Sequence, residues 1–469
     1  MTERIPNLRD ILETGYEAWE KAAPAELRVA EICGAARADL PENKLLRADN
    51  LGVMKSCARD GQAGAFDLIY ADPPFFSRSN YGADIKLKSA SGNTLPALRR
   101  DAYNDAWDDD PEAYLRMLVP RFFGFRELLS RTGCLWVHLD WHAVHCVKIL
   151  LDAIFGEENL VNEVIWNYKS GGVSRRRFAR KHDTLLFYAK TKEYYFKPQK
   201  EKSYNRGLKP YRFKGVKEYR DEVGWYTLVN MKDVWQLDMV GRTSAERTGY
   251  ATQKPEALIA RILESCTREG DLCADFFAGS GTLAAAAERM GRRWLLCDSG
   301  RFAAINAQKR MLNLGAAFSV LTGAGGGANG SEASGGGGSG EAVAGEAGDF
   351  EAECRAERTV DPGKTRVTLR LLRCGLPAGS AVPVDARNLP LVEAALREDP
   401  LLLVDYWSAD FSYDGELFRP RICLCRDAGG IVDRCESLLQ GEPRVAVRVV
   451  DIFGNESFRK VESTAFERF

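Results

Sequence analysis

The sequence has no long apolar run. None of its hydrophobic segments approaches the roughly 20 residues that a membrane-spanning helix needs, and the first 21 residues are too polar for a secretory signal. The twelve cysteines form no Cys-x-x-Cys pair, so they predict reduced, buried thiols in a cytosolic protein rather than a structural zinc site. The formal net charge of −1 gives no global attraction to nucleic acid, and any such attraction has to be local.

The charge is distributed unevenly along the chain. Residues 169–220 contain 17 Lys or Arg and only four acidic residues, with aromatic residues interleaved among the bases. A solvated surface would have this composition, yet clustered cations with interspersed rings suit phosphates and unstacked bases. The pattern therefore predicts that this stretch contacts nucleic acid.

Three segments divide the chain. Residues 1–320 alternate short apolar runs with helical patterns, which predicts an α/β fold with a parallel sheet. Residues 321–349 are rich in Gly, Ala and Ser and predict a flexible linker. Residues 350–469 predict a small β-rich C-terminal domain, and its 17 bases and 20 acids argue against a role as the main phosphate binder.

A first candidate site is Asp72-Pro73-Pro74-Phe75, directly after the apolar run at 66–71. The run predicts a strand buried on both faces, and α/β sheets place ligands at the carboxyl ends of such strands. Two acceptors, the Asp72 carboxylate and the Pro73 carbonyl oxygen, could hold both hydrogens of an exocyclic amine on a nucleobase. Phe75 could stack on that base, which is worth roughly 1–3 kcal/mol. A plain surface turn is the alternative, and the tetrapeptide alone leaves both open.

A second candidate site is the segment 275–282, where a predicted strand ends in a glycine turn before a helix. The glycines let a ligand approach the backbone, and the helix N-terminus offers free N–H groups. Asp298 ends the next predicted strand, 17 residues after Gly281, where an acid binds ribose hydroxyls in dinucleotide folds. A tight turn and a loop acid are the alternatives; together the two features predict a nucleoside cofactor.

In this order the segments resemble the β class of DNA amino-methyltransferases, which use S-adenosylmethionine. Residues 72–75 match the family's catalytic motif, and residues 277–282 match its cofactor motif, in the permuted order of that class. Residues 47–51 resemble the segment that contacts the cofactor's adenine, although Ala48 replaces the usual Gly, and residues 246–255 resemble the segment near its methionine end. The similarity covers about residues 30–315 and implies a Rossmann-like sheet with helices on both faces.

The resemblance assigns roles to particular residues. The implied catalytic residues are Asp72, Pro73, Pro74 and Phe75. The implied cofactor-binding residues are Asp49, Asn50, Leu51, Lys254, Asp275, Phe276, Phe277, Ala278, Gly279, Ser280, Gly281, Thr282 and Asp298. The candidate DNA-binding residues, within a target recognition region at about 169–245, are Lys169, Arg175, Arg176, Arg177, Arg180 and Lys181.

The implied reaction is site-specific methylation of DNA. The target base leaves the duplex, at a cost of a few kcal/mol, and its amine attacks the sulfonium methyl without a covalent enzyme intermediate. Asp72 favours N6 of adenine, because N4-cytosine members more often carry Ser-Pro-Pro, but N4 of cytosine stays open. A non-catalytic DNA-binding module of the same fold and an RNA or protein methyltransferase are further alternatives.

The resemblance also implies a setting. We expect a bacterial cytoplasmic enzyme of restriction-modification that acts on double-stranded DNA and binds no membrane. The C-terminal segments 405–416 and 451–455 resemble extensions on modification enzymes that work beside a helicase-type restriction partner, and the family often forms homodimers.

Some residues invite other interpretations. His138, His142 and His145 have the spacing of metal ligands, but the first falls in a predicted strand and the others begin a helix, so we predict no metal site. Asp140 could shape the pocket or cap the end of its strand. Three tryptophans are predicted to lie in the core rather than to stack on a base: Trp136, Trp141 and Trp166.

Overall fold

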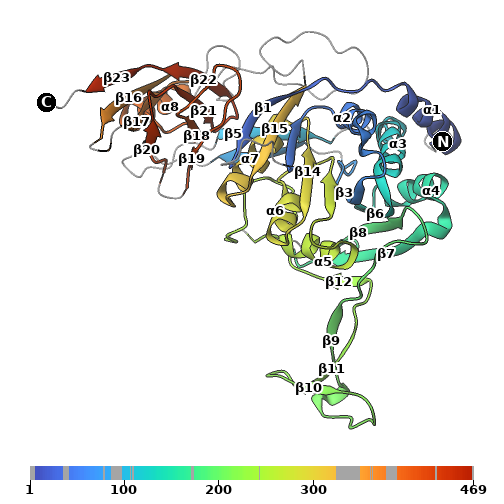
Figure 1. The fold of residues 1–469 in the computed structure, drawn as a ribbon. Helices are drawn as coiled ribbons and strands as arrows, with labels where there is room; N and C mark the ends of the chain where they lie inside the picture. Colours follow the sequence, from blue (N-terminus) through green and yellow to red (C-terminus); the bar gives the residue numbers. More distant parts are fainter. Residues whose placement is uncertain are drawn as a thin grey trace.

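A computed structural model gives the fold of the chain (Figure 1). It describes residues 6–34, 42–77, 80–85, 98–105, 107, 110–170, 174–241, 243–323, 349–359, 361, 363–376, 388–427 and 430–466. Most of the predicted linker at 321–349 lies outside the described residues, and residues 321–323 instead finish strand β15. Within the described residues, no helix is both long and apolar enough to cross a membrane.

The centre of the N-terminal part is a ten-stranded sheet. In spatial order its strands are β1 (Leu27–Cys33), β15 (Phe318–Gly323), β2 (Lys44–Arg47), β14 (Arg293–Cys297), β13 (Leu272–Asp275), β3 (Phe66–Ala71), β6 (Leu129–Leu139), β8 (His182–Ala189), β7 (Leu160–Asn167) and β12 (Val234–Gln236). The strands from β15 to β6 run parallel, as predicted. The prediction of a purely parallel sheet is wrong at β1 and β8, which run antiparallel to their neighbours.

Helices cover both faces of the sheet, which confirms the α/β prediction. One face packs against α1 (Leu8–Lys21), α2 (Asn50–Cys57), α3 (Pro111–Leu128) and α4 (Val144–Phe155), and the other against α5 (Glu256–Cys266), α6 (Thr282–Arg289) and α7 (Arg301–Asn313). In β3, Ile69 belongs to the first core and Leu68 and Tyr70 to the second. Successive strand residues point to opposite faces, so a strand between two helix layers has to be apolar on both sides.

The region predicted for target recognition, 169–245, is not one insertion. β8 lies within it and is a buried strand of the central sheet, between β6 and β7. The part that projects is a three-stranded arm, which extends away from the body in Figure 1. Its strands are β9 (Lys200–Tyr204), β10 (Glu218–Arg220) and β11 (Trp225–Asn230). A separate pair, β4 (Asn80–Ile85) and β5 (Leu98–Asn104), follows the first candidate site.

The C-terminal domain is a β-sandwich with one helix. One sheet contains β20 (Arg434–Gln440), β17 (Lys364–Cys374), β16 (Phe350–Arg358) and β23 (Ser463–Phe466), and the other β19 (Ile422–Cys425), β18 (Val404–Asp410), β21 (Val445–Asp451) and β22 (Glu456–Val461). Residues of both sheets, among them Val367 and Trp407, share one core. The sequence predicted a β-rich domain but not the helix α8 (Leu389–Glu398).

The sandwich packs on the sheet edge formed by β1 and on α7. Arg448 of β21 makes buried ion pairs with Glu31 of β1 and with Glu456. Lys309 of α7 pairs with Asp405 at 2.6 Å. The C-terminal segments noted for their resemblance therefore have structural roles, since Asp405 anchors the sandwich to α7.

Candidate functional site

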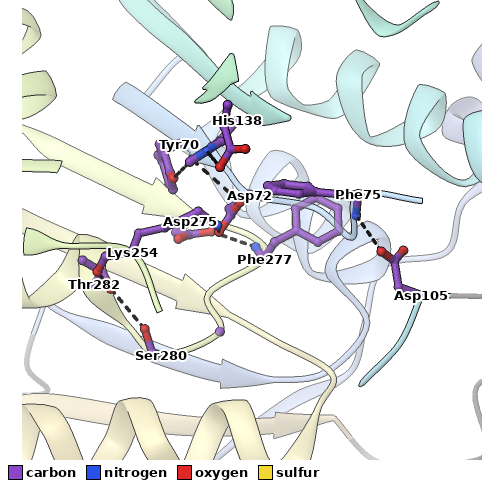
Figure 2. A network of polar contacts seen from close by, with 12 residues as sticks. Tyr70, Asp72, Phe75, Asp105, His138, Lys254, Asp275, Phe277, Ser280 and Thr282 are labelled. Atoms are coloured by element: carbon purple, nitrogen blue, oxygen red, sulfur yellow. Dashed lines mark hydrogen bonds and ion pairs between the residues drawn. The ribbon is translucent and has the colours of Figure 1, made fainter. Parts of the chain in front are cut away.

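The two candidate sites meet at one edge of the central sheet. β13 and β3 are parallel neighbours, with Asp275 opposite Tyr70. Asp72 follows the end of β3, and the glycine turn follows the end of β13, so segments about 200 residues apart in sequence lie side by side. Figure 2 shows Asp72, Asp275 and Lys254 close together at this edge. The carboxyl ends of β14 and β2, which precede Asp298 and Asp49, lie at the same edge.

Asp72 has one paired and one unpaired carboxylate oxygen. Its Oδ2 accepts a hydrogen bond from Lys254 Nζ at 2.5 Å. Its Oδ1 is buried and has no hydrogen-bond partner among the described residues. A buried acceptor without a donor is unfavourable by about 1–3 kcal/mol, and such groups mark places where a ligand completes the pairing. The geometry therefore offers one carboxylate oxygen to a donor from outside the chain.

The loop after Asp72 is held by a residue that the sequence did not single out. The Asp105 carboxylate accepts backbone N–H groups from Phe75, Phe76 and Ser77, at 3.2, 2.9 and 2.7 Å. Phe76 has φ +60°, a strained conformation for an aromatic residue. Asp105 is fully buried, so its hydrogen bonds keep this loop in one shape. Asp105 lies 30 residues from Phe75 in the sequence and has no motif around it, so no sequence pattern indicated that it holds this loop.

The ring of Phe75 lies in the site beside charged and aromatic groups. Lys254 Nζ is 4.9 Å from the centroid of that ring, and the His138 ring centroid is 5.5 Å from it. The carbonyl oxygen of Pro74 accepts a hydrogen bond from Tyr114 of α3 at 2.7 Å. The tetrapeptide 72–75 is thus bound on one side by Lys254 and on the other by α3, and it is not a free surface turn.

The glycine turn after β13 is built by two left-handed residues. Gly279 has φ +49° and Gly281 has φ +73°, a region that residues with a side chain rarely adopt. A Cβ on Gly281 would also come within 3.0 Å of the Ala307 Cβ. Asp298 Oδ2 accepts the Gly279 N–H at 2.8 Å, and its Oδ1 accepts the Gly300 N–H at 2.8 Å. Asp298 therefore joins the turn to the end of β14.

Several side chains of the segment 275–282 support the turn itself. Phe276 is fully buried and stacks on Phe125, so only its backbone can reach a ligand. Thr282 Oγ1 donates to the Lys254 carbonyl oxygen at 3.1 Å, which joins α6 to the segment that carries Lys254. Arg310 of α7 donates to the Ser280 carbonyl oxygen at 3.1 Å. The sequence predicted the turn but not this arginine.

The residues predicted to contact the cofactor's adenine lie at the start of α2. Asp49 caps the helix by accepting from the backbone of Leu51 and Gly52 at 3.0 and 3.4 Å. The Asn50 amide donates to the Phe276 carbonyl oxygen at 2.7 Å. Arg121 of α3, another residue without a sequence signal, pairs with Asp49 at 2.9 Å. These contacts fix α2 against the glycine turn.

Negative charge dominates the site. Asp72, Asp275 and Asp298 gather there, and Lys254 is the cation among them. Burial, together with the charges of Asp72 and Asp298, raises the pKa of Asp275 well above its usual range. Burial also raises the pKa of Asp298 to about 6. The site therefore favours a ligand that brings positive charge.

A buried polar chain lies behind Asp72 (Figure 2 shows Tyr70 and His138). Tyr70 Oη is 2.8 Å from His138 Nδ1, and His138 Nε2 is 3.3 Å from Asp183 Oδ2. Tyr168 donates to the other Asp183 oxygen at 3.0 Å. His138 therefore has polar partners on both ring nitrogens. His142 instead pairs with Asp140 at 2.6 Å, so Asp140 holds the turn after β6.

The predicted DNA-binding residues lie on the loop between β7 and β8, at the same sheet edge. Arg175, Arg176 and Arg177 are exposed. Phe178, which lies between these arginines and Arg180, is 99% exposed. Tyr168 N donates to the Lys181 carbonyl oxygen at 3.0 Å and closes the base of the loop. Lys169 is exposed as well.

One prediction about tryptophan is wrong. Trp136 and Trp166 are buried as predicted, but Trp141 is 41% exposed. The Arg180 guanidinium lies 3.4 Å from the centroid of its ring. Trp141 follows Asp140 after the end of β6, at the edge of the sheet, and Arg180 of the basic loop packs on its ring.

The matches to known proteins agree with this geometry. The chain belongs to the N6/N4 DNA methylase family, whose model matches residues 66–309, more than half of the chain. That span runs from β3 to α7 and so contains both Asp72 and the glycine turn.

Individual relatives are type II methyltransferases. The chain is 26% identical over 280 residues to M2.LlaDCHI of Lactococcus lactis subsp. cremoris, and the aligned region covers 59% of this chain and 91% of that protein. It is 27% identical over 251 residues to M2.DpnII of Streptococcus pneumoniae, with 53% and 82% covered. Among solved structures, the M1.HpyAVI–SAM complex aligns with a TM-score of 0.38 and 17% identity, over 57% of this chain and 98% of that one.

Proposed function

We propose that the chain methylates the exocyclic amine of a base in double-stranded DNA, with S-adenosylmethionine as methyl donor and N6 of adenine as the target. The observation that carries the proposal is the unpaired Oδ1 of Asp72. An exocyclic amine donates two hydrogens, and one of them would complete this buried acceptor. The family covers both N6 and N4 methylases, and Asp72 favours adenine by resemblance, so N4 of cytosine is the second candidate.

The residues present fit the proposed cofactor. Three carboxylates around one lysine favour a cationic ligand, and the pKa of Asp275 is raised because burial and the neighbouring carboxylates disfavour its charge. Asp298 would accept hydrogen bonds from the ribose hydroxyls, and the Gly279–Gly281 turn lets the backbone come close. When bound, S-adenosylmethionine supplies an electrophilic methyl group on a sulfonium.

The chain's own residues position the amine. Asp72 Oδ1 and the Pro73 carbonyl oxygen would each accept one amine hydrogen, which directs the nitrogen lone pair away from the two acceptors. Lys254 fixes the orientation of Asp72 through its hydrogen bond to Oδ2. Phe75, fixed by Asp105 through the loop backbone, would stack on the base. Alignment and preorganised acceptors thus supply the catalysis, and Asp72 Oδ1 can take the proton that the methylated amine releases.

The loop between β7 and β8 and the projecting arm would bind the DNA. Six basic side chains lie at the edge of the sheet where the target nucleobase has to enter: Lys169, Arg175, Arg176, Arg177, Arg180 and Lys181. The arm adds Lys202, Arg206, Lys209, Arg212, Lys214 and Lys217. Phosphate contacts of this kind make binding weaken steeply with salt. The homodimer, the helicase-type restriction partner and the cytoplasmic location remain predictions of the resemblance.

Modification-sensitive sequencing of DNA from cells that express the chain tests the proposal. We expect methylated adenine in one sequence context, and loss of the marks with Asp72→Ala. Asp140→Asn is the matched control, since Asp140 ends the neighbouring strand and holds only the turn with His142. Marks on cytosine would shift the assignment to N4. Marks that persist in the Asp72→Ala cells, or no marks with the wild-type chain, would overturn the proposal.

A further inference from the structure

Tyr70, His138 and Asp183 form a buried chain that ends beside the catalytic carboxylate. His138 is fully buried, and Tyr70 and Asp183 are 2% and 9% exposed. His138 Nδ1 lies 3.9 Å from Asp72 Oδ1, too far for a hydrogen bond. The edge of the Trp166 ring packs against the imidazole, with centroids 5.4 Å apart. Because His138 is fully buried, its role in the site is to act through neighbouring residues, of which Asp72 carries the unpaired oxygen.

The partners of His138 assign its tautomer. Asp183 also accepts from Tyr168, and the hydrogen bonds from His138 and Tyr168, with the charge of Lys254, outweigh burial and keep the pKa of Asp183 below its usual range. An ionised carboxylate only accepts, so His138 carries its N–H on Nε2. Nδ1 then has a lone pair, which accepts the Tyr70 hydroxyl. Burial and the charge of Asp72 raise the pKa of Tyr70 well above its usual range, so that hydroxyl stays protonated.

This tautomer matters for Asp72 Oδ1. With the lone pair on Nδ1, no N–H of His138 faces Asp72, and Oδ1 keeps its capacity for the substrate. A proton on Nδ1 would place a donor 3.9 Å from Oδ1, and a small shift of the side chain would make a hydrogen bond that competes with the amine. A carboxylate that fixes a histidine tautomer is a known way to set catalytic geometry.

We propose that Asp183 is a positioning residue that holds His138 in the Nε2–H tautomer, so that Asp72 Oδ1 stays available to the substrate amine. The inference rests on the proposed function and deepens it. The charged and titratable groups around the ring are Asp72, Asp183, Lys254, Tyr70 and Tyr168.

Asp183→Asn is the test variant, because the amide keeps the shape but loses the charge. Its NH₂ group can donate to Nε2, which moves the ring proton to Nδ1. We expect kcat to fall about 10–100-fold, with the KM for DNA and the Kd for S-adenosylmethionine within about twofold. A loss confined to kcat separates a positioning role from a packing defect, which would weaken binding as well.

Tyr168→Phe is the matched control. It removes a partly buried hydrogen bond to the same carboxylate but leaves the Asp183–His138 contact in place. We expect kcat of this variant to stay close to that of the wild type. An equal loss of kcat in both variants would mean that the cluster acts by packing alone and would overturn the inference.

A second readout does not depend on turnover. The chain has four histidines, so ¹⁵N-histidine labelling gives a small set of ring signals that report the tautomer directly. We expect one ring with its proton on Nε2 in the wild type and a proton on Nδ1 in Asp183→Asn. A wild-type His138 with its proton on Nδ1, or an Asp183→Asn variant with unchanged kcat, refutes the inference while DNA methylation by the wild type stands. Absence of methylation by the wild type would instead refute the proposed function.

Discussion

Removal of the Asp105 carboxylate should loosen the loop that carries Phe75. In Asp105→Ala the buried N–H of Phe76 loses its acceptor, which costs about 1–3 kcal/mol. The N–H groups of Phe75 and Ser77 belong to partly exposed residues and can bond water instead. The strain of Phe76 at φ +60°, of order 1–3 kcal/mol, is then no longer held in place. Together these terms favour local opening by about 3 kcal/mol.

Hydrogen exchange measures this opening directly. A change of about 3 kcal/mol corresponds to roughly 100-fold faster exchange of the amides at 75–77, and kcat should fall because Phe75 is no longer held beside Asp72. Asp105→Asn, which keeps one acceptor oxygen, should lie between Asp105→Ala and the wild type.

Asp110→Ala is the control for the Asp105 experiment. Asp110 also accepts two backbone N–H groups, from Glu112 and Ala113, but it caps α3 at the surface. Its loss should cost about 1 kcal/mol of helix stability and leave exchange at 75–77 unchanged. Wild-type exchange at 75–77 in Asp105→Ala would show that Asp105 does not hold this loop.

Three further predictions concern other parts of the molecule. Arg448→Met leaves the buried Glu31 carboxylate without its cationic partner and should destabilise the docked sandwich by about 3–5 kcal/mol in chemical denaturation. Adding Glu31→Gln should recover part of the loss, and full additivity would contradict the pairing. Burial raises the pKa of Asp298 to about 6, so binding of the cationic cofactor near pH 6 should release protons. Calorimetry in buffers of different ionisation enthalpy should therefore give different binding enthalpies. The same binding enthalpy in every buffer would contradict this prediction. Replacing Arg175, Arg176 and Arg177 by Ala should lower the salt slope of DNA binding by up to about 3, whereas an unchanged slope would place the phosphate contacts elsewhere.

The two candidate segments could be predicted because each motif is local. The strand before Asp72 and the strand before the glycine turn are continuous apolar runs, and both ends are marked by prolines or glycines. Parallel strands put their carboxyl ends at one edge. That rule places the ends of parallel neighbouring strands side by side, and the register of β13 with β3 does so for these two segments.

The partners of these residues could not be predicted in the same way. Lys254 was assigned to the cofactor by resemblance, yet it pairs with Asp72 at 2.5 Å. Asp105, Arg121 and Asp183 carry no motif, and the site residues Ser77, Asp49 and His138 that they contact lie 28, 72 and 45 positions away in the sequence. Contacts of this range depend on how helices and loops pack on the sheet, which no local pattern encodes.

The sequence by itself determined the strands, the two motifs and the division into an α/β body and a β-rich domain, because hydrophobic periodicity, prolines and glycines act over a few residues. Only the tertiary structure decided which Asp72 oxygen stays unpaired, that β8 runs antiparallel and brings Asp183 to His138, and that the sandwich docks through Arg448. These features arise where chain segments distant in sequence pack against one another, and there burial and pairing set the free energy of each polar group.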